Sequence, residues 1–523
     1  MNWMMQWLGV QLFLRTIQQN KLMVKFVKRI FSKKPINDLY INKDHDKTLK
    51  RTIGPINLII MGLGCIIGAG IFIVTGVASA KSSGPALVLS FILSATACIF
   101  TALCYAEFAS MIPVSGSVYT YTYVAMGEIW AWMIGWVLMY EYLISASAVA
   151  VGWSSYVVGL LSSAGIILPQ IISAPSGAGL INLPAVFIII LLTGILILGV
   201  KQSTRFNAIV VLINILIILL FIFVGLGHIN PANYHPFMPF GFSGVLQGAA
   251  MVFFAYIGFD AVSTAAEETK NPQRTMPIGI IGSLIISSIL YIAVAAVLNG
   301  IVPYNLLDTP APVIFALKSI GINWAASIVS FGALFGLTSV LLTSLFGQSR
   351  IFYSMSRDGL LPEIFSHLHE NFRSPVICII LVGTAAAMVA AFFPLNSIIE
   401  LVNIGTLSAF IFLALSIIIL RKQKPDIPRK FKCPLVPIIP ILSIVFCSFL
   451  IFQLSHITLE RFIISLLIGI AVYFVYGMKN SKLRQYDTDI SNFKGINQIF
   501  DLLNSAMRII LNQVEKNRRN KRF

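Results

Sequence analysis

The chain has 523 residues, of which 57% are hydrophobic and only 11% are charged. A soluble domain carries about 25% charged residues, so this composition excludes soluble folds and predicts an all-α protein that crosses a membrane many times. The net charge of +17 comes from 37 Lys and Arg against 20 Asp and Glu. In a membrane protein such an excess usually marks cytoplasmic loops, so nucleic acid is not an expected partner.

Twelve apolar spans are predicted within a transporter-like domain at residues 52–477. Their approximate limits are 54–80, 85–111, 129–160, 183–200, 206–228, 244–266, 276–301, 323–349, 375–394, 396–420, 434–454 and 459–477. With the N-terminus inside, the short inner loops hold 13 Lys and Arg and the outer loops hold 3. This bias predicts an inner (plasma) membrane protein whose two termini are cytoplasmic.

Two basic tails flank the predicted spans. Residues 1–51 are expected to be cytoplasmic, and Trp3, Trp7, Val10 and Leu14 give their start an amphipathic pattern typical of a membrane-surface segment. Residues 478–523 form the second basic tail, which is also expected in the cytoplasm. Both tails are candidates for contact with anionic lipid, so the lipid bilayer is an expected partner.

The first span contains an internal break signal. No charged residue occurs between Arg51 and Lys81, yet six glycines do, and Gly68-Ala69-Gly70 lies near the middle. A helix interrupted there would free the N–H groups of its second half, whose partial positive charge suits a carboxylate. Close packing of neighbouring helices through small residues is the alternative interpretation of this stretch.

The sixth span carries a matching signal. The sequence FFAYIGFDA at 253–261 is apolar but is interrupted by Gly258 and Asp260. Two glycine-interrupted spans in corresponding positions are typical of inverted-repeat transporters. We therefore expect one repeat at about 52–228, an inverted repeat at about 240–420, and two extra helices at 434–477.

Placing an ionisable side chain within an apolar span costs free energy, so each such residue calls for a structural or functional explanation. Glu141 lies well inside the third span without a basic neighbour in sequence, so it must be protonated, paired across helices or facing water, and we favour a functional role. Glu107 is expected to order the loop at Pro113, Glu400 is interpreted as an interfacial residue, and Asp260 is expected to cap the second half of the sixth span. No nucleophile–base pair, Walker motif or metal-ligand cluster is evident, so no enzyme activity, cofactor or metal is expected.

Several of these stretches resemble a known family. GAGIFIVTG, YEYLISASAVAVGWS, FFAYIGFDAVSTAAEETKNPQRTMPIGI and FGQSRIFYSMSRDGLLP are similar to the amino acid–polyamine–organocation (APC) superfamily, most closely to its cationic amino acid transporter branch with its bacterial homologues. The resemblance covers about residues 48–477. It implies a LeuT-type fold, with five plus five inverted spans and two more, that carries L-amino acids by alternating access.

The resemblance also implies roles for individual residues. The substrate carboxylate would meet the backbone N–H groups of Gly68, Ala69 and Gly70. The α-ammonium would meet carbonyls of two broken spans, at Ile66, Phe253, Phe254, Ala255 and Ile257. Phe254 or its neighbour would gate the site, Glu141 matches a third-span glutamate implicated in transport, and the side-chain pocket would involve Leu337 and Ser339.

One position departs from part of the family. Proton-coupled bacterial relatives often carry a lysine in the fifth span, where Asn214 stands here, so facilitated diffusion is favoured and proton coupling is in doubt. The name of the branch points to cationic amino acids, but no acidic residue lies between Trp324 and Arg350, in the span expected to form the side-chain pocket. Both neutral and cationic amino acids are therefore kept as candidate substrates. A polyamine carrier and a transporter-like amino acid sensor are the alternatives, and a small membrane helper subunit is left open.

Overall fold

The computed structural model describes residues 29–35, 53–113, 116–163, 165–174, 179–197, 204–309, 311–369 and 374–485. Within these ranges the named elements are all helices, accompanied by two isolated β-bridges. The all-helical class predicted from composition is therefore confirmed for the described chain. Most of the two basic tails, including the amphipathic pattern at 3–14, lies outside the described residues.

The main α-helices follow one another with short connections. They are α4 (Pro55–Ile66), α5 (Thr75–Ala78), α6 (Leu87–Met111), α7 (Ser117–Ala125), α8 (Glu128–Ser163), α9 (Gln170–Ser173), α10 (Leu183–Ile197), α11 (Thr204–Leu226), α12 (Gly241–Val252), α13 (Pro272–Ile301), α14 (Pro312–Ser319), α15 (Asn323–Arg357), α16 (Val376–Phe392), α17 (Leu395–Gln423), α18 (Ile438–Phe452), α19 (His456–Val472) and α20 (Met478–Asn480). Shorter 3-10 and π segments join them, of which η1 (Gly70–Val74), η5 (Phe253–Tyr256) and η6 (Asp260–Glu268) matter most below.

Eight continuous helical stretches among the described residues are long and apolar enough to cross a membrane. Four shorter apolar helices, α4, α10, α16 and α18, accompany them. The stretch at 70–111 counts as one run, although Gly84, with φ of 60°, and Pro85 interrupt it before α6 begins. The chain is therefore a multi-pass membrane protein.

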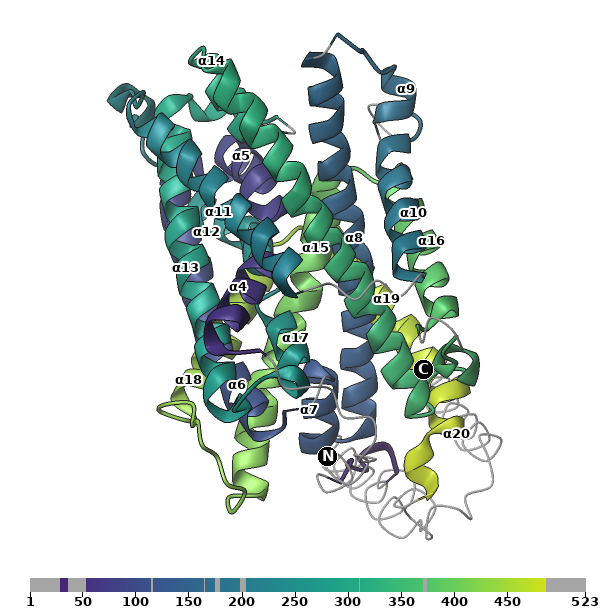
Figure 1. Ribbon diagram of the computed structural model, residues 1–523. Helices are drawn as coiled ribbons and strands as arrows, with labels where there is room; N and C mark the ends of the chain where they lie inside the picture. The colour runs from purple at the N-terminus through teal and green to yellow at the C-terminus, as the bar shows by residue number, and fades with distance from the viewer. Residues whose placement is uncertain are drawn as a thin grey trace, which may run out of the picture.

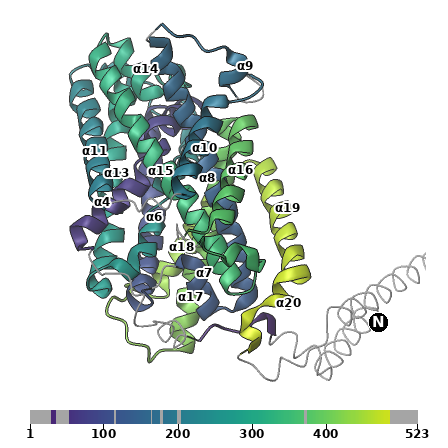
Figure 2. The same cartoon turned by 45° about the vertical axis from the view of Figure 1, so that its right-hand side comes forward.

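The helices form an elongated bundle (Figures 1 and 2). In both views α11 and α13 lie on one side, and α10 and α16 lie on the other. Between them, α8 packs along α15 and α17, while α6 packs along α13. At 36 residues α8 is the longest helix, in agreement with the long third span expected from the sequence.

Apolar side chains occupy both the interior and the outside of this bundle. Large exposed examples include Phe187 on α10, Phe223 on α11 and Phe452 on α18. In water such surfaces would drive association, whereas hydrocarbon solvates them. The outward faces of these helices thus suit contact with lipid.

The described parts of the two tails meet at one end of the bundle, near α7 and α20 in Figure 1. Lys34 forms an ion pair with Asp358, which follows α15, at 2.9 Å. The backbone N–H of Lys482 donates to the carbonyl of the same Asp358 at 3.0 Å. Glu128, at the start of α8, is buried and accepts a hydrogen bond from the hydroxyl of Ser481 in the C-terminal tail, and its N–H donates to the carbonyl of Ser32 in the N-terminal tail at 2.9 Å. Both tails are thereby anchored to the ends of α8 and α15.

Candidate functional site

The first expected span is interrupted where its glycines cluster. Helix α4 ends at Ile66, and Ile67 adopts an extended backbone with φ of −78° and ψ of 99°. The chain bends through Gly68 and then continues as the π segment η1 from Gly70. The hydroxyl of Tyr291 on α13 donates to the Ile66 carbonyl at 2.8 Å, so one lone pair of this predicted ammonium ligand already has a protein partner.

The sixth expected span is interrupted in a similar way. Helix α12 ends at Val252, the 3-10 segment η5 follows, and Ile257 is extended with ψ of 135°. Gly258 then has φ of 113°, a conformation that favours glycine because it has no Cβ. A Cβ at this position would also stand 2.4 Å from the carbonyl oxygen of Cys65 in α4, so the sharp turn and the close approach both require glycine.

The two interruptions touch each other. A Cβ on Gly70 would stand 2.2 Å from the Cα of Ala255 and 2.4 Å from its Cβ. A Cβ on Gly68 would stand 2.8 Å from a methyl group of Val340 on α15. Gly70 therefore lets the two broken helices meet at backbone distance, and Gly68 leaves room for a side chain of α15.

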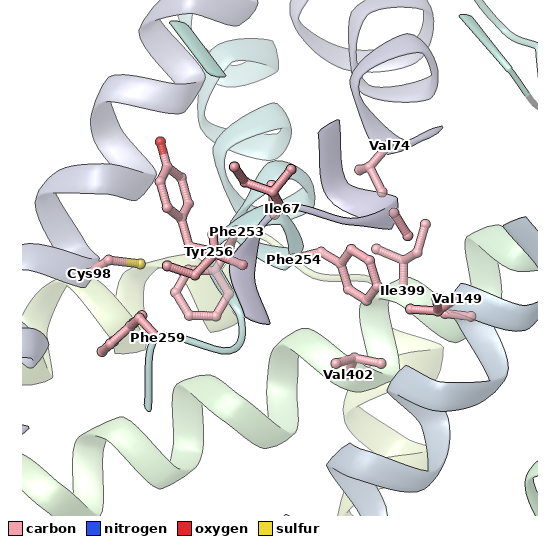
Figure 3. Packing of buried hydrophobic residues seen from close by; sticks show 14 of the residues in the cluster. Ile67, Val74, Cys98, Val149, Phe253, Phe254, Tyr256, Phe259, Ile399 and Val402 are labelled. Atoms are coloured by element: carbon pink, nitrogen blue, oxygen red, sulfur yellow. The ribbon is translucent and has the colours of Figure 1, made fainter. Parts of the chain in front are cut away.

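The predicted substrate-binding residues gather at this crossing. Phe254 is 6% exposed, and Figure 3 shows its ring directed toward Val149 of α8 and Ile399 of α17. Ile257 is partly exposed and lines a small cavity beside the breaks. The remaining members are buried, namely Ile66, Gly68, Ala69, Gly70, Phe253 and Ala255. Their ligand roles stay predictions.

The cavity beside the breaks has a volume of about 30 Å³, which is room for one or two water molecules. Its polar lining includes Glu141, Tyr142, Ser145, Asp260, Thr343 and Ser344, and no Lys or Arg is among the described residues around it. Glu141 is 2% exposed, and its Oε2 has no hydrogen-bond partner among the described residues. This carboxylate is therefore placed to accept a donor from whatever enters the cavity.

Asp260 lies at the turn that follows the break in the sixth span. Its Oδ1 accepts the N–H of Gly258 at 3.2 Å. Its expected role as a cap of the second half of this span stays a prediction. The sequence also gave no reason to pair Asp260 with Glu141 around one cavity.

Asn214 and the predicted side-chain pocket lie together on α11 and α15. A Cβ on Gly336 would stand 2.6 Å from the Nδ2 atom of Asn214, so the amide packs directly against the α15 backbone. Asn214 is buried and its Oδ1 has no partner among the described residues. Leu337 is fully buried, whereas Ser339 is half-buried. The structure thus brings Asn214 next to the predicted pocket, where no acidic side chain had been expected.

Glu107 and Glu400 both have partners within the protein, and those of Glu107 lie at the end of α17 and in the loop that follows it. Arg421 donates to Glu107 from Nε at 3.0 Å and from Nη2 at 2.5 Å, and the N–H of Cys433 donates at 2.8 Å. Glu400 accepts the hydroxyl of Thr458 at 2.6 Å, at the start of α19. Neither carboxylate lies in the cavity lining.

These features define a multi-pass membrane protein with two interrupted helices in contact. A family model described as amino acid permease matches residues 53–474, so the chain belongs to the amino acid permease family of the APC superfamily. Membership of this family indicates a transporter of the amino acid permease class.

Three relatives illustrate the range of the family. The chain is 49% identical over 462 residues to the branched-chain amino acid permease BcaP of Bacillus subtilis, covering 87% of this chain and 99% of the relative. It is 48% identical over 459 residues to the methylthioribose transporter of the same organism, again covering 87% and 99%. It is 39% identical over 400 residues to cationic amino acid transporter 4, vacuolar, of Arabidopsis thaliana, covering 74% and 66%.

Proposed function

We propose that the protein is a secondary transporter that moves L-amino acids by alternating access. The observation that carries the proposal is the contact between the two interrupted helices, at Gly70 and Ala255. A half-helix N-terminus and unwound carbonyls suit a carboxylate and an ammonium respectively, and an α-amino acid carries both groups.

The same proposal includes the finer architecture. The eight long and four shorter apolar stretches would make twelve spans, with α4 and η1 as the first and α12 to η6 as the sixth. These two interrupted spans stand five apart, which supports a LeuT-type arrangement of inverted repeats. The excess of Lys and Arg in the inner loops supports cytoplasmic termini.

Neutral amino acids with branched side chains are the first substrate class that we propose. Support comes from the relative named as a branched-chain amino acid permease, at 49% identity, and from the apolar Leu337 in the predicted pocket. Cationic amino acids are the second class, because Glu141 and Asp260 line the cavity beside Ile257 without a basic partner among the described residues. A cationic side chain would offer the Oε2 of Glu141 the donor that it lacks among the described residues.

A thermal-shift screen of the purified protein tests binding. It should include the L-amino acids, polyamines and, because one relative is a methylthioribose transporter, methylthioribose. A ligand at 100 times its Kd stabilises the folded state by about 2.7 kcal/mol, which is readily detected. We expect leucine, isoleucine and valine to raise the unfolding temperature most. A response to polyamines alone, or to methylthioribose alone, would contradict the proposal.

Counterflow in proteoliposomes tests transport. Vesicles preloaded with an unlabelled hit should accumulate the labelled compound transiently. Binding without any flux would contradict the transporter proposal and favour the amino acid sensor.

A further inference from the structure

Helix α17 contacts the sixth span just before its break. Asn403 is fully buried on α17, and its Nδ2 donates to the carbonyl of Ala250 at 2.7 Å and to that of Met251 at 3.3 Å. Both acceptors lie in the last turn of α12, which ends at Val252. An amide from a different helix thus binds the end of this half-helix.

The position of this amide matters because the last carbonyls of an α-helix lack intrahelical partners. If α12 continued as an α-helix, the N–H groups four residues ahead would bind the carbonyls of Ala250 and Met251. The backbone instead tightens into the 3-10 segment η5. The Asn403 amide therefore supplies a donor from another helix to two carbonyls at the point where the helix type changes, one of which, that of Met251, also accepts the N–H of Phe253.

A second contact from α17 reaches both sides of the break. The ring of Phe410 lies 5.9 Å from that of Phe253, before the break, and 5.1 Å from that of Phe259, after it. Asn403 and Phe410 are seven residues apart, so they share one face of α17.

We infer that Asn403 is a positioning residue that fixes where the sixth span stops being an α-helix. By binding two carbonyls in the last turn of α12, its amide sets the direction of the carbonyls that follow, at Phe253, Phe254 and Ala255. The proposed function assigns these carbonyls to the substrate ammonium, so the expected effect of Asn403 on substrate affinity rests on that function. The expected effect of Asn403 on the backbone at 253–257 is independent of the proposed function.

Hydrogen–deuterium exchange of the ligand-free protein tests the backbone effect. Asn403→Leu and Asn403→Asp remove both N–H donors, and the aspartate keeps the shape of the side chain. Amide exchange at 253–257 should become about five- to a hundredfold faster, as expected for losing two net hydrogen bonds. Phe410→Leu, which removes the ring that spans the break, should speed exchange in the same segment.

A matched control comes from α13. Asn299 is also fully buried; its Nδ2 donates to the Ala295 carbonyl of its own helix at 2.9 Å, and its Oδ1 accepts the hydroxyl of Ser79. Asn299→Leu is the same chemical change at an amide whose hydrogen-bond partners do not include the sixth span. It should leave exchange at 253–257 at the wild-type rate.

Binding supplies the second readout. The affinity of Asn403→Asp for leucine should fall about 10- to 100-fold, while Asn299→Leu should keep wild-type affinity. Wild-type exchange at 253–257 in the folded Asn403 variants and in Phe410→Leu would overturn the inference. If the wild-type protein binds no amino acid, the proposed function fails, and the exchange rates still decide the role of Asn403.

Discussion

Adding one methyl group at Gly70 is expected to abolish tight substrate binding. In Gly70→Ala the new Cβ would stand 2.2 Å from the Cα of Ala255. Carbon atoms make favourable contact at about 3.5 Å or more, so the two broken helices must separate by roughly 1.3 Å. Overpacking of this kind costs about 1–3 kcal/mol, and a 1 Å misplacement of binding groups can cost about 100-fold.

The affinity for leucine, measured by titration, and the KM in counterflow should both therefore worsen about 100-fold in Gly70→Ala. Gly194→Ala on α10 is the matched control, because nothing lies within 4 Å of a Cβ at that position. Size-exclusion profiles should show both variants folded. Wild-type affinity in folded Gly70→Ala would refute the reasoning, since it would place the substrate away from this crossing.

Three further outcomes are expected. In proteoliposomes a pH gradient should not drive accumulation of a neutral amino acid, because the side chain of Asn214 cannot change charge. If concentrative uptake does occur and disappears in Glu141→Gln while counterflow is retained, Glu141 is the proton-linked group instead. Amino acid amides and α-keto acids should fail to compete with the substrate, because each lacks one of the two α-charges; full competition by either would contradict the assignment of both helix breaks. Glu107→Gln should lower stability by up to about 3 kcal/mol in thermal unfolding, because it removes the carboxylate that pairs with both Arg421 and Arg429; an unchanged unfolding temperature would show that both guanidinium groups find other partners.

The sequence predicted the interrupted helices well, because their cause is local. Glycine near the middle of an uncharged apolar span weakens a helix whatever surrounds it, and α4 indeed ends at Ile66, two residues before Gly68. The 3-10 character of η6 was not predicted. The pattern around Asp260 looks like an ordinary helix start, whereas the direction of that side chain depends on the turn at Gly258.

The polar partners within the bundle were much harder to predict. Glu141 was recognised as unusual, yet its shared cavity with Asp260 depends on how α8 and η6 pack, which periodicity does not encode. No specific role was predicted for Asn403, because a single asparagine in an apolar span usually indicates only a hydrogen bond between two helices. Its relation to the end of α12 appears only when the two helices are side by side.

The length of α8 has a mechanical consequence. Thirty-six residues at 1.5 Å each make a rod of about 54 Å, against about 30 Å of hydrocarbon in a bilayer. Near one end the indole of Trp132 donates to the Gly469 carbonyl of α19, and near the other the hydroxyl of Tyr156 donates to the Phe72 carbonyl in the first broken span. A rigid rod of this length that pivots by 10° about one end displaces its other end by roughly 9 Å. A small tilt of α8 at one surface would therefore produce a large displacement of this helix at the opposite surface.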